Sequence, residues 1–195
     1  MGNPVSWRRA FIAFLLLCLV AAFTYVRQTG LRARATPGTF ETRVARTVRS
    51  WAISSRDRQR QNPVPASEAS HREALEHYAD HCASCHADDG SGETMFGRGL
   101  FPPPPDLRDP ATQRLTDGEL FYVIENGIRF TGMPGFGTGT ADGEEQSWKL
   151  VRFIRHLPKL TAAEREAMKD LIPRPPVEIR QEIEEERFLR GEGPG

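Results

Sequence analysis

The residues best suited to chemistry in this sequence form one short run, Cys82-Ala83-Ser84-Cys85-His86. Two thiols three positions apart lie on one turn of chain and can add to the two vinyl groups on one edge of a porphyrin. The histidine that follows can then ligate the iron from one side. C-x-x-C-H is the attachment pattern of c-type haem. The run therefore predicts one covalently bound haem c, with its iron, held by Cys82, Cys85 and His86.

Two other uses of a cysteine pair fit the rest of the chain less well. A thioredoxin-like redox pair stands at the start of a helix that follows a strand, whereas this pair falls at a predicted helix end with no β-α-β pattern around it. A zinc site needs a second pair of ligands. The histidines outside the run are His71, His77 and His81 just upstream and His156 well downstream. Haem attachment is the favoured interpretation.

Iron in an electron carrier takes a sixth ligand, and a methionine in that position raises the reduction potential. Met133 lies 47 residues after His86, in Thr131-Gly132-Met133-Pro134-Gly135, where small residues let the backbone approach a flat cofactor. Met95 is nine residues from His86, too close to reach the opposite face of the ring, and Met168 lies in a charged helical stretch typical of a packing residue. The expected iron ligands are His86 and Met133.

Taken in order, these motifs resemble a class I monohaem c-type cytochrome of the bacterial, membrane-anchored kind. The resemblance covers roughly residues 66–158 and rests on the Cys82–His86 run, the helix from Leu120 to Gly127, the Gly132-Met133-Pro134 segment and a final helix led by Trp148. It implies an all-α chain with a small cytochrome c fold and haem-wrapping loops. It also implies electron transfer between redox protein partners, with no small-molecule substrate and no enzymatic activity.

The resemblance implies two further residues at the cofactor. The family uses a proline carbonyl to accept the proton of the iron-ligating histidine, which fixes its tautomer. Pro105, in Pro105-Asp106-Leu107, is the best match within four consecutive prolines, and a partner-docking polyproline stretch is the alternative. Trp148 is interpreted as a core residue packed against the first helix of the domain, with contact to a haem propionate as the weaker hypothesis.

Capping signals predict where the helices of this domain begin. Capping boxes are expected at Ser70–Glu73, Thr116–Glu119 and Thr161–Glu164. The second box predicts a helix over residues 117–126 that Gly127 ends, and the apolar pattern predicts a last core helix over 144–157. The residues expected to share buried faces are Leu75, Tyr78, Ala79, Cys82, Leu120, Phe121, Ile124, Trp148, Val151, Ile154 and Leu157.

An apolar run from Ala10 to Val26, bounded by arginines, precedes everything described so far. Its 17 residues would span about 25 Å as a helix, which is short for a bilayer and long for the core of a cleaved signal. We expect residues 1–27 to form an uncleaved signal-anchor, and a signal cleaved near Val20-Ala21-Ala22 is the alternative. The protein would then cross the cytoplasmic membrane once, with its haem domain in the periplasm.

Charge divides the chain into two parts. Residues 1–61 carry 11 arginines against two acidic residues, whereas residues 62–195 carry 15 basic and 24 acidic residues. The arginine excess after the apolar run conflicts with the expected orientation, because positive charge favours the cytoplasmic side. The net charge of the whole chain is zero, which argues against a nucleic-acid binder, and three cysteines are too few for a disulfide scaffold.

Four segments follow from these patterns: the anchor over 1–27, an Arg-rich helix and proline linker over 28–65, a cytochrome c domain over 66–160 and an acidic helical extension over 161–195. Within the second segment, residues 39–60 predict an amphipathic helix. An Arg-rich face opposite Trp and Phe suits the surface of a membrane, and a solvated helix packed on the domain is an equal alternative.

These expectations combine into a membrane-anchored periplasmic electron carrier whose single haem c cycles between Fe(II) and Fe(III). A haem c subunit fixed in a larger respiratory or dehydrogenase complex is the alternative, with the Arg-rich segment and acidic tail as assembly surfaces. An open-site haem enzyme or gas sensor is less favoured. A di-haem peroxidase needs two attachment motifs, and a cytochrome c′-type bundle carries its motif near the C-terminus, whereas 109 residues follow His86.

Overall fold

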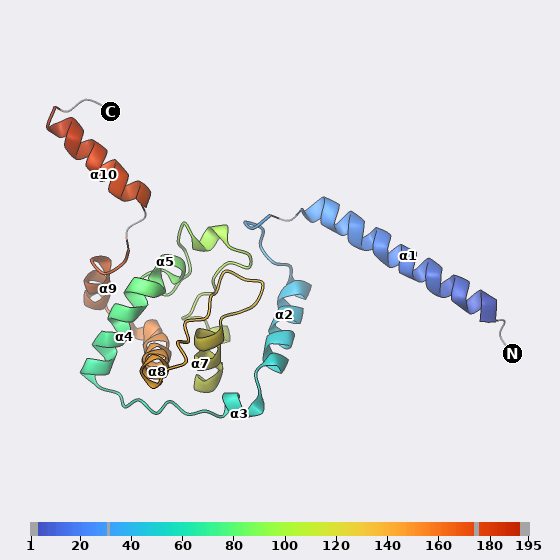
Figure 1. Ribbon diagram of the computed structural model, residues 1–195, viewed down its shortest axis with the longest axis horizontal. Helices are drawn as coiled ribbons and strands as arrows, with labels where there is room; N and C mark the ends of the chain where they lie inside the picture. The colour runs from blue at the N-terminus through green and yellow to red at the C-terminus, as the bar shows by residue number, and fades with distance from the viewer. Residues whose placement is uncertain (1–3, 31, 174–175, 192–195) are drawn as a thin grey trace.

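A computed structural model describes residues 4–30, 32–173 and 176–191, and over these residues its regular structure is helical, without a strand. The first helix, α1 (Pro4–Thr29), and the last, α10 (Pro176–Leu189), project away from a cluster of helices that lies between them in sequence (Figure 1). The expected all-α class with a leading apolar helix is confirmed.

Three longer helices lie between these two ends: α2 (Thr39–Ala52), α4 (Glu68–His81) and α8 (Ala141–His156). The shorter helices are α3 (Ser55–Arg58), α5 (Ala83–His86), α6 (Pro110–Gln113), α7 (Asp117–Asn126) and α9 (Ala162–Lys169), with 3-10 turns at Gly97–Gly99 and Leu157–Lys159.

The core of the cluster is the packing of α4 against α8, and α7 packs against α8 beside it. On α4 the contact face contains the small residues Ala74 and Ala79, which are 1% and 0% exposed and let the two helices approach closely. On α8 it contains Val151 and Phe153, both 0% exposed. The Tyr78 and Phe153 rings meet with centroids 5.0 Å apart. These contacts fix the direction of α4, and therefore of the chain that leaves its end.

Local caps explain where the helices begin. Helix α7 starts and ends as predicted, because the Thr116 hydroxyl accepts from the Glu119 N–H and the Glu119 carboxylate accepts from the Thr116 N–H. The N-cap of α4 is Ser67, three residues before the expected Ser70, and Ser70 completes the capping box. Helix α8 begins at Ala141 rather than at residue 144, because the Thr140 hydroxyl caps it.

The predicted helix over residues 39–60 is divided in the structure. Helix α2 ends at Ala52, and Ile53 turns into the interior, where it is 3% exposed. A new turn, α3, starts after Ser54, whose hydroxyl accepts from the Asp57 N–H. Burial of one isoleucine thus outweighs the helical periodicity of the segment.

Two segments outside residues 66–160 also pack on the core. Val64 is 7% exposed within the buried cluster, and the neighbouring Asn62 side chain donates to the Trp148 carbonyl at 2.8 Å. At the other end, α9 follows the Thr161–Glu164 capping box as predicted and buries Met168 completely. Met168 is therefore a packing residue, as expected.

Helix α1 is long and apolar enough, over Trp7–Gln28, to cross a membrane. None of this 22-residue stretch is buried against the rest of the chain. Its side chains described in the structure are exposed, including Phe11, Leu15 and Phe23. By length and composition, this helix could cross a membrane or serve as a signal sequence.

Candidate functional site

The Cys82–His86 run forms the junction between α4 and the short helix α5. The Cys82 N–H donates to the Tyr78 carbonyl at 2.9 Å and so ends α4. The Cys82 carbonyl accepts from the N–H groups of Cys85 and His86, at 3.1 and 2.8 Å, and so starts the next turn. Both cysteines are half-buried free thiols on this turn. Two separate thiols are what covalent attachment of one group through two sulfur atoms requires.

Burial controls the state of the first thiol. Cys82 packs against the buried hydrophobic cluster. Burial first, and the nearby Cys85 second, raise the pKa of the Cys82 thiol to about 12. The sulfur of Cys82 is therefore neutral at physiological pH, and a neutral thioether sulfur would suit the same apolar surroundings.

The chain after His86 folds back over the run. The His86 carbonyl accepts from the Gly92 N–H at 2.9 Å, and the Cys85 carbonyl accepts from the Thr94 hydroxyl at 3.3 Å. A Cβ atom at Gly97 would lie 2.8 Å from the Cys85 carbonyl oxygen and 2.6 Å from that of Gly92. The tight return of this loop therefore requires glycine at position 97, and it fixes the backbone at Cys85 and His86.

The imidazole of His86 is held in its neutral form. Burial lowers the pKa of its imidazole, and the backbone carbonyl of Pro105 acts in the opposite direction. The Nδ1 atom is buried and has no partner with full hydrogen-bond geometry among the described residues. A neutral ring is the form that ligates a metal. The imidazole, the adjoining carbonyl and the two free thiols fit a covalently bound haem.

The segment that carries Pro105 is tied to the chain after the run by an ion-pair cluster. Arg108 contacts Asp106 at 2.7 Å and Asp89 at 3.0 Å. These contacts raise the pKa of Arg108, chiefly through its hydrogen bond to Asp106. The Leu107 N–H also donates to the Gly90 carbonyl at 2.8 Å. Sequence reasoning missed this cluster; its only local signal was Arg108, the one basic residue between Arg98 and Arg114.

The Met133 loop begins where α7 ends. Gly127 ends α7 with φ +66°, and the Ile128 N–H then donates to the Met133 carbonyl at 3.1 Å. The loop runs back along α7, because the Phe136 N–H donates to the Ile124 carbonyl at 2.9 Å. A Cβ atom at Gly127 would lie 2.6 Å from the Met133 carbonyl oxygen. The position of Met133 therefore depends on glycine at the end of α7.

The same loop lies against the segment that precedes the prolines. A Cβ atom at Gly132 would lie 2.7 Å from the side chain of Leu100. Met133 itself is half-buried, and its backbone N–H donates to the Thr131 hydroxyl at 3.1 Å. By contrast, Met95 is 64% exposed and Met168 is fully buried in the core. Of the three methionines after His86, Met133 combines partial burial with a braced backbone.

Trp148 lies in the core rather than in a loop. It is 3% exposed, and its indole stacks on Phe121 of α7 with centroids 4.1 Å apart and planes 16° apart. The Arg60 guanidinium lies over the Phe121 ring at 4.2 Å and the indole at 5.3 Å. The indole therefore packs between α8 and α7, whereas the expected partner was the first helix of the domain, and a cofactor contact of Trp148 stays a prediction.

Comparison with known proteins agrees with this geometry. Residues 69–154 match the family described as cytochrome c oxidase, cbb3-type, subunit III. No curated protein matches the chain. The matched region runs from α4 to α8, so it contains the Cys82–His86 run and the Met133 loop, whereas α1, α2, α3, α9 and α10 lie outside it. Residues 69–154 are therefore a c-type cytochrome domain, which binds haem c covalently and serves electron transfer.

Proposed function

We propose that the protein is an electron carrier with a single haem c, tethered to the cytoplasmic membrane by α1, with its haem domain in the periplasm. Cys82 and Cys85 would attach the haem, and His86 and Met133 would supply the ligands of its iron. The carrier catalyses no bond chemistry of its own and exchanges electrons with redox protein partners. The observation that carries the proposal is the pair of free thiols and the neutral His86 in one turn.

The chain's own residues would hold the cofactor and line its binding site. The two thiols would retain it, and the backbone carbonyl of Pro105, which acts on the His86 ring, would orient that ring by accepting its N–H. Gly127 and Thr131 contact the backbone of Met133, whose sulfur would be the second iron ligand. When bound, haem c supplies a reversible one-electron couple between Fe(II) and Fe(III), and a methionine ligand raises its potential.

The membrane part of the proposal is supported by α1 and by the helix after it. Helix α2 exposes Phe40, Val44, Val48 and Trp51, of which Phe40 is 79% and Trp51 80% exposed. Such a helix with an Arg-rich polar face can lie in the headgroup region beside the anchor. Mass spectrometry of the mature N-terminus tests the anchor: an intact Met1 or Gly2 end supports it, whereas an end near residue 22 indicates a cleaved signal.

A second candidate function is a haem c subunit fixed in a larger respiratory complex. It is favoured by the family description, which names a subunit of an oxidase. The exposed residues of α2 and of α10, such as Ile183 and Phe188, would then be assembly surfaces. Size-exclusion chromatography of the complex extracted in mild detergent separates the two: a lone monomer supports the carrier, and co-elution with a defined set of subunits supports the complex.

Visible spectra of the matured protein, oxidised and then reduced, test the proposed ligands. A low-spin c-type spectrum with the weak far-red band of Met–Fe(III) ligation supports His86 and Met133. A high-spin spectrum, or a c-type spectrum without that band, removes Met133 and points to ligand binding or catalysis. Absence of haem after expression with the maturation machinery contradicts the whole proposal.

A further inference from the structure

Three side chains with metal-binding atoms meet on the side of the domain where α9 docks. His71 lies in the first turn of α4, His156 ends α8, and Glu164 lies in the first turn of α9. The Glu164 Oε1 atom is 2.7 Å from the His71 Nε2 atom and 2.8 Å from the His156 Nε2 atom. All three ligating atoms lie within 4.8 Å of one another.

The carboxylate in this cluster is held in place by its own helix. The second oxygen of Glu164, Oε2, accepts hydrogen bonds from the Thr161 N–H and the Thr161 hydroxyl, both at 2.7 Å. Oε1 is therefore the oxygen directed at the two imidazoles. Burial would raise the pKa of Glu164, but the hydrogen bonds from Thr161 and His71 prevail and lower it to about 2. The carboxylate is ionised at neutral pH, as a metal ligand must be.

The helix that supplies Glu164 is itself anchored. Met168 of α9 is fully buried in the core, and Arg165 of α9 contacts Asp88 at 3.2 Å. On the other side, the rings of His71 and His156 lie edge to face with centroids 4.6 Å apart, and the His71 ring also contacts Phe153. The three donors thus project from three packed helices rather than from loops, which is the arrangement that a preorganised metal site needs.

We propose that His71, His156 and Glu164 bind a zinc ion that joins α9 to α4 and α8. Two imidazole nitrogens and one carboxylate oxygen are a donor set that zinc prefers, with a water molecule as fourth ligand. Zn–N and Zn–O distances of about 2.0–2.2 Å set donor atoms roughly 3.4 Å apart in a tetrahedron. The two contacts to Oε1, now 2.7 and 2.8 Å, would therefore open by about 0.6–0.7 Å. Each Nε2 binds zinc without its proton, which is released or moves to Nδ1.

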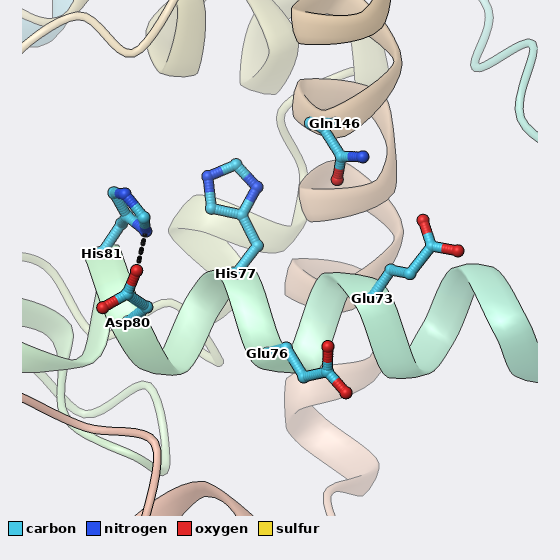
Figure 2. A pocket seen from close by; sticks show the side chains of 6 residues that line it. All are labelled: Glu73, Glu76, His77, Asp80, His81 and Gln146. Atoms are coloured by element: carbon cyan, nitrogen blue, oxygen red, sulfur yellow. Dashed lines mark ion pairs between the residues drawn. The ribbon is translucent and has the colours of Figure 1, made fainter.

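The chain offers an internal control in a second pair of histidines. His77 and His81 project from α4 on the side where Gln146 of α8 lies, with Glu73 nearby (Figure 2). Their ring centroids are 4.9 Å apart, and the His81 Nδ1 atom contacts Asp80 at 3.0 Å. Among the described residues, three possible ligand atoms lie within 4.8 Å of one another at His71, His156 and Glu164. Among the same residues, no third ligand atom lies as close to both His77 and His81.

Isothermal titration of the haem-loaded full chain in detergent with zinc chloride, after chelator treatment, tests the site. One equivalent of zinc is expected to bind, with affinity reduced at least tenfold in His71→Gln, His156→Gln and Glu164→Gln. Glutamine keeps a hydrogen-bonding group at each position, and Glu164→Gln preserves the capping box. Haem spectra and circular dichroism check that each variant is folded.

The double variant His77→Gln/His81→Gln is expected to bind zinc as the wild type does. Loss of binding in this double variant, or equal affinity in the wild type and the three site variants, would overturn the proposal. Zinc-edge X-ray absorption of the wild type gives an independent result that needs no variant. Two imidazole ligands are expected, and a spectrum with oxygen ligands alone contradicts the site. Neither result depends on which residues ligate the haem iron.

Discussion

The phenolic hydroxyl of Tyr78 donates a 2.9 Å hydrogen bond to the backbone carbonyl of Ala87, the residue directly after His86. Tyr78 is 1% exposed, and burial raises the pKa of its hydroxyl well above the usual value, so it stays a donor. Ala87 has φ +64°, a conformation that L residues seldom adopt. The contact thus links the core of the domain to the strained turn that leaves the proposed iron ligand.

Replacing Tyr78 by Phe should therefore destabilise the holoprotein by about 1 kcal/mol, the usual net value of one hydrogen bond. The loss is not larger because the Ala87 carbonyl also accepts from the Gly90 N–H at 3.3 Å. Denaturant unfolding measures the change. Tyr122→Phe is the matched control, because Tyr122 is half-buried on α7. Equal losses in both variants would mean that the contact to Ala87 contributes nothing specific.

Met133→Ala should lower the reduction potential and open the iron to carbon monoxide. The expected drop is on the order of 0.1 V, within the ~0.8 V range over which axial ligands tune haem. Redox titration and carbon monoxide difference spectra give the two readouts. Met95→Ala is the control, since Met95 is 64% exposed. A normal potential and a closed iron in Met133→Ala would remove Met133 as ligand, and the same changes in Met95→Ala instead would assign that role to Met95.

The elements that could be predicted from sequence are those set by neighbouring residues. Helix α7 runs from Asp117 to Asn126 as expected, because its cap, its box partner and its terminal Gly127 are all local. The first helix of the domain, α4, was expected to have Ser70 as its N-cap, yet Ser67 is the cap and Ser70 takes the N3 place of the box, where glutamate or glutamine is usual. The break of α2 before Ile53 was not predictable, since it depends on tertiary burial.

The candidate site likewise has one part that local sequence predicts and other parts that depend on packing. The Cys82–His86 run is local and was recognisable from spacing alone. The bridge from Arg108 to Asp89 joins residues 19 apart, and the close approach of Gly127 to the Met133 backbone depends on how the loop returns along α7. The cluster of His71, His156 and Glu164 depends on the docking of α9. Such contacts follow from packing, which periodicity and spacing do not specify.

Gly127→Ala should displace the Met133 loop. A methyl group at this position would lie 2.6 Å from the Met133 carbonyl oxygen, and φ +66° is itself unfavourable for alanine. Weakening of the far-red Met–Fe(III) band is expected, together with a loss of stability. Gly139→Ala is the matched control, because Gly139 has φ +72° with nothing within 4 Å of an added Cβ atom.

Both glycines have a positive φ, but an added Cβ atom meets close neighbours at Gly127 and none at Gly139, so the comparison tests the contact with the Met133 loop. The far-red band should be unchanged in Gly139→Ala. If both variants keep the band at full intensity, the Met133 loop tolerates the added methyl group and the contact does not position the ligand.

The docking of α9 should weaken in acid. The pKa of Glu164 is about 2 in the folded protein against 4.5 for a free side chain, so the folded state binds the proton less well. Its contribution to stability is complete above pH 4.5 and disappears as the pH falls towards 2. The difference in unfolding free energy between wild type and Glu164→Gln should therefore shrink across this window, measured by denaturant unfolding with a chelator present.

Glu166→Gln is the control for this titration, because Glu166 lies on the same helix and its side chain is 72% exposed. The unfolding free energy of Glu166→Gln should differ little from that of the wild type at every pH measured. The difference in unfolding free energy between the wild type and Glu164→Gln could instead stay constant between pH 4.5 and 2. That result would show that Glu164 is not held ionised by Thr161 and His71.

Trp148→Phe distinguishes packing from a contact with the cofactor. Because the indole stacks on Phe121 at 4.1 Å, the smaller ring should cost about 1–3 kcal/mol of stability and leave the reduction potential unchanged. Phe121→Leu is the matched variant, since it disturbs the same stack from the α7 side and should also destabilise the domain at constant potential. A shifted potential in Trp148→Phe alone would instead mean that the indole nitrogen acts on a haem propionate, because only that variant removes the N–H donor.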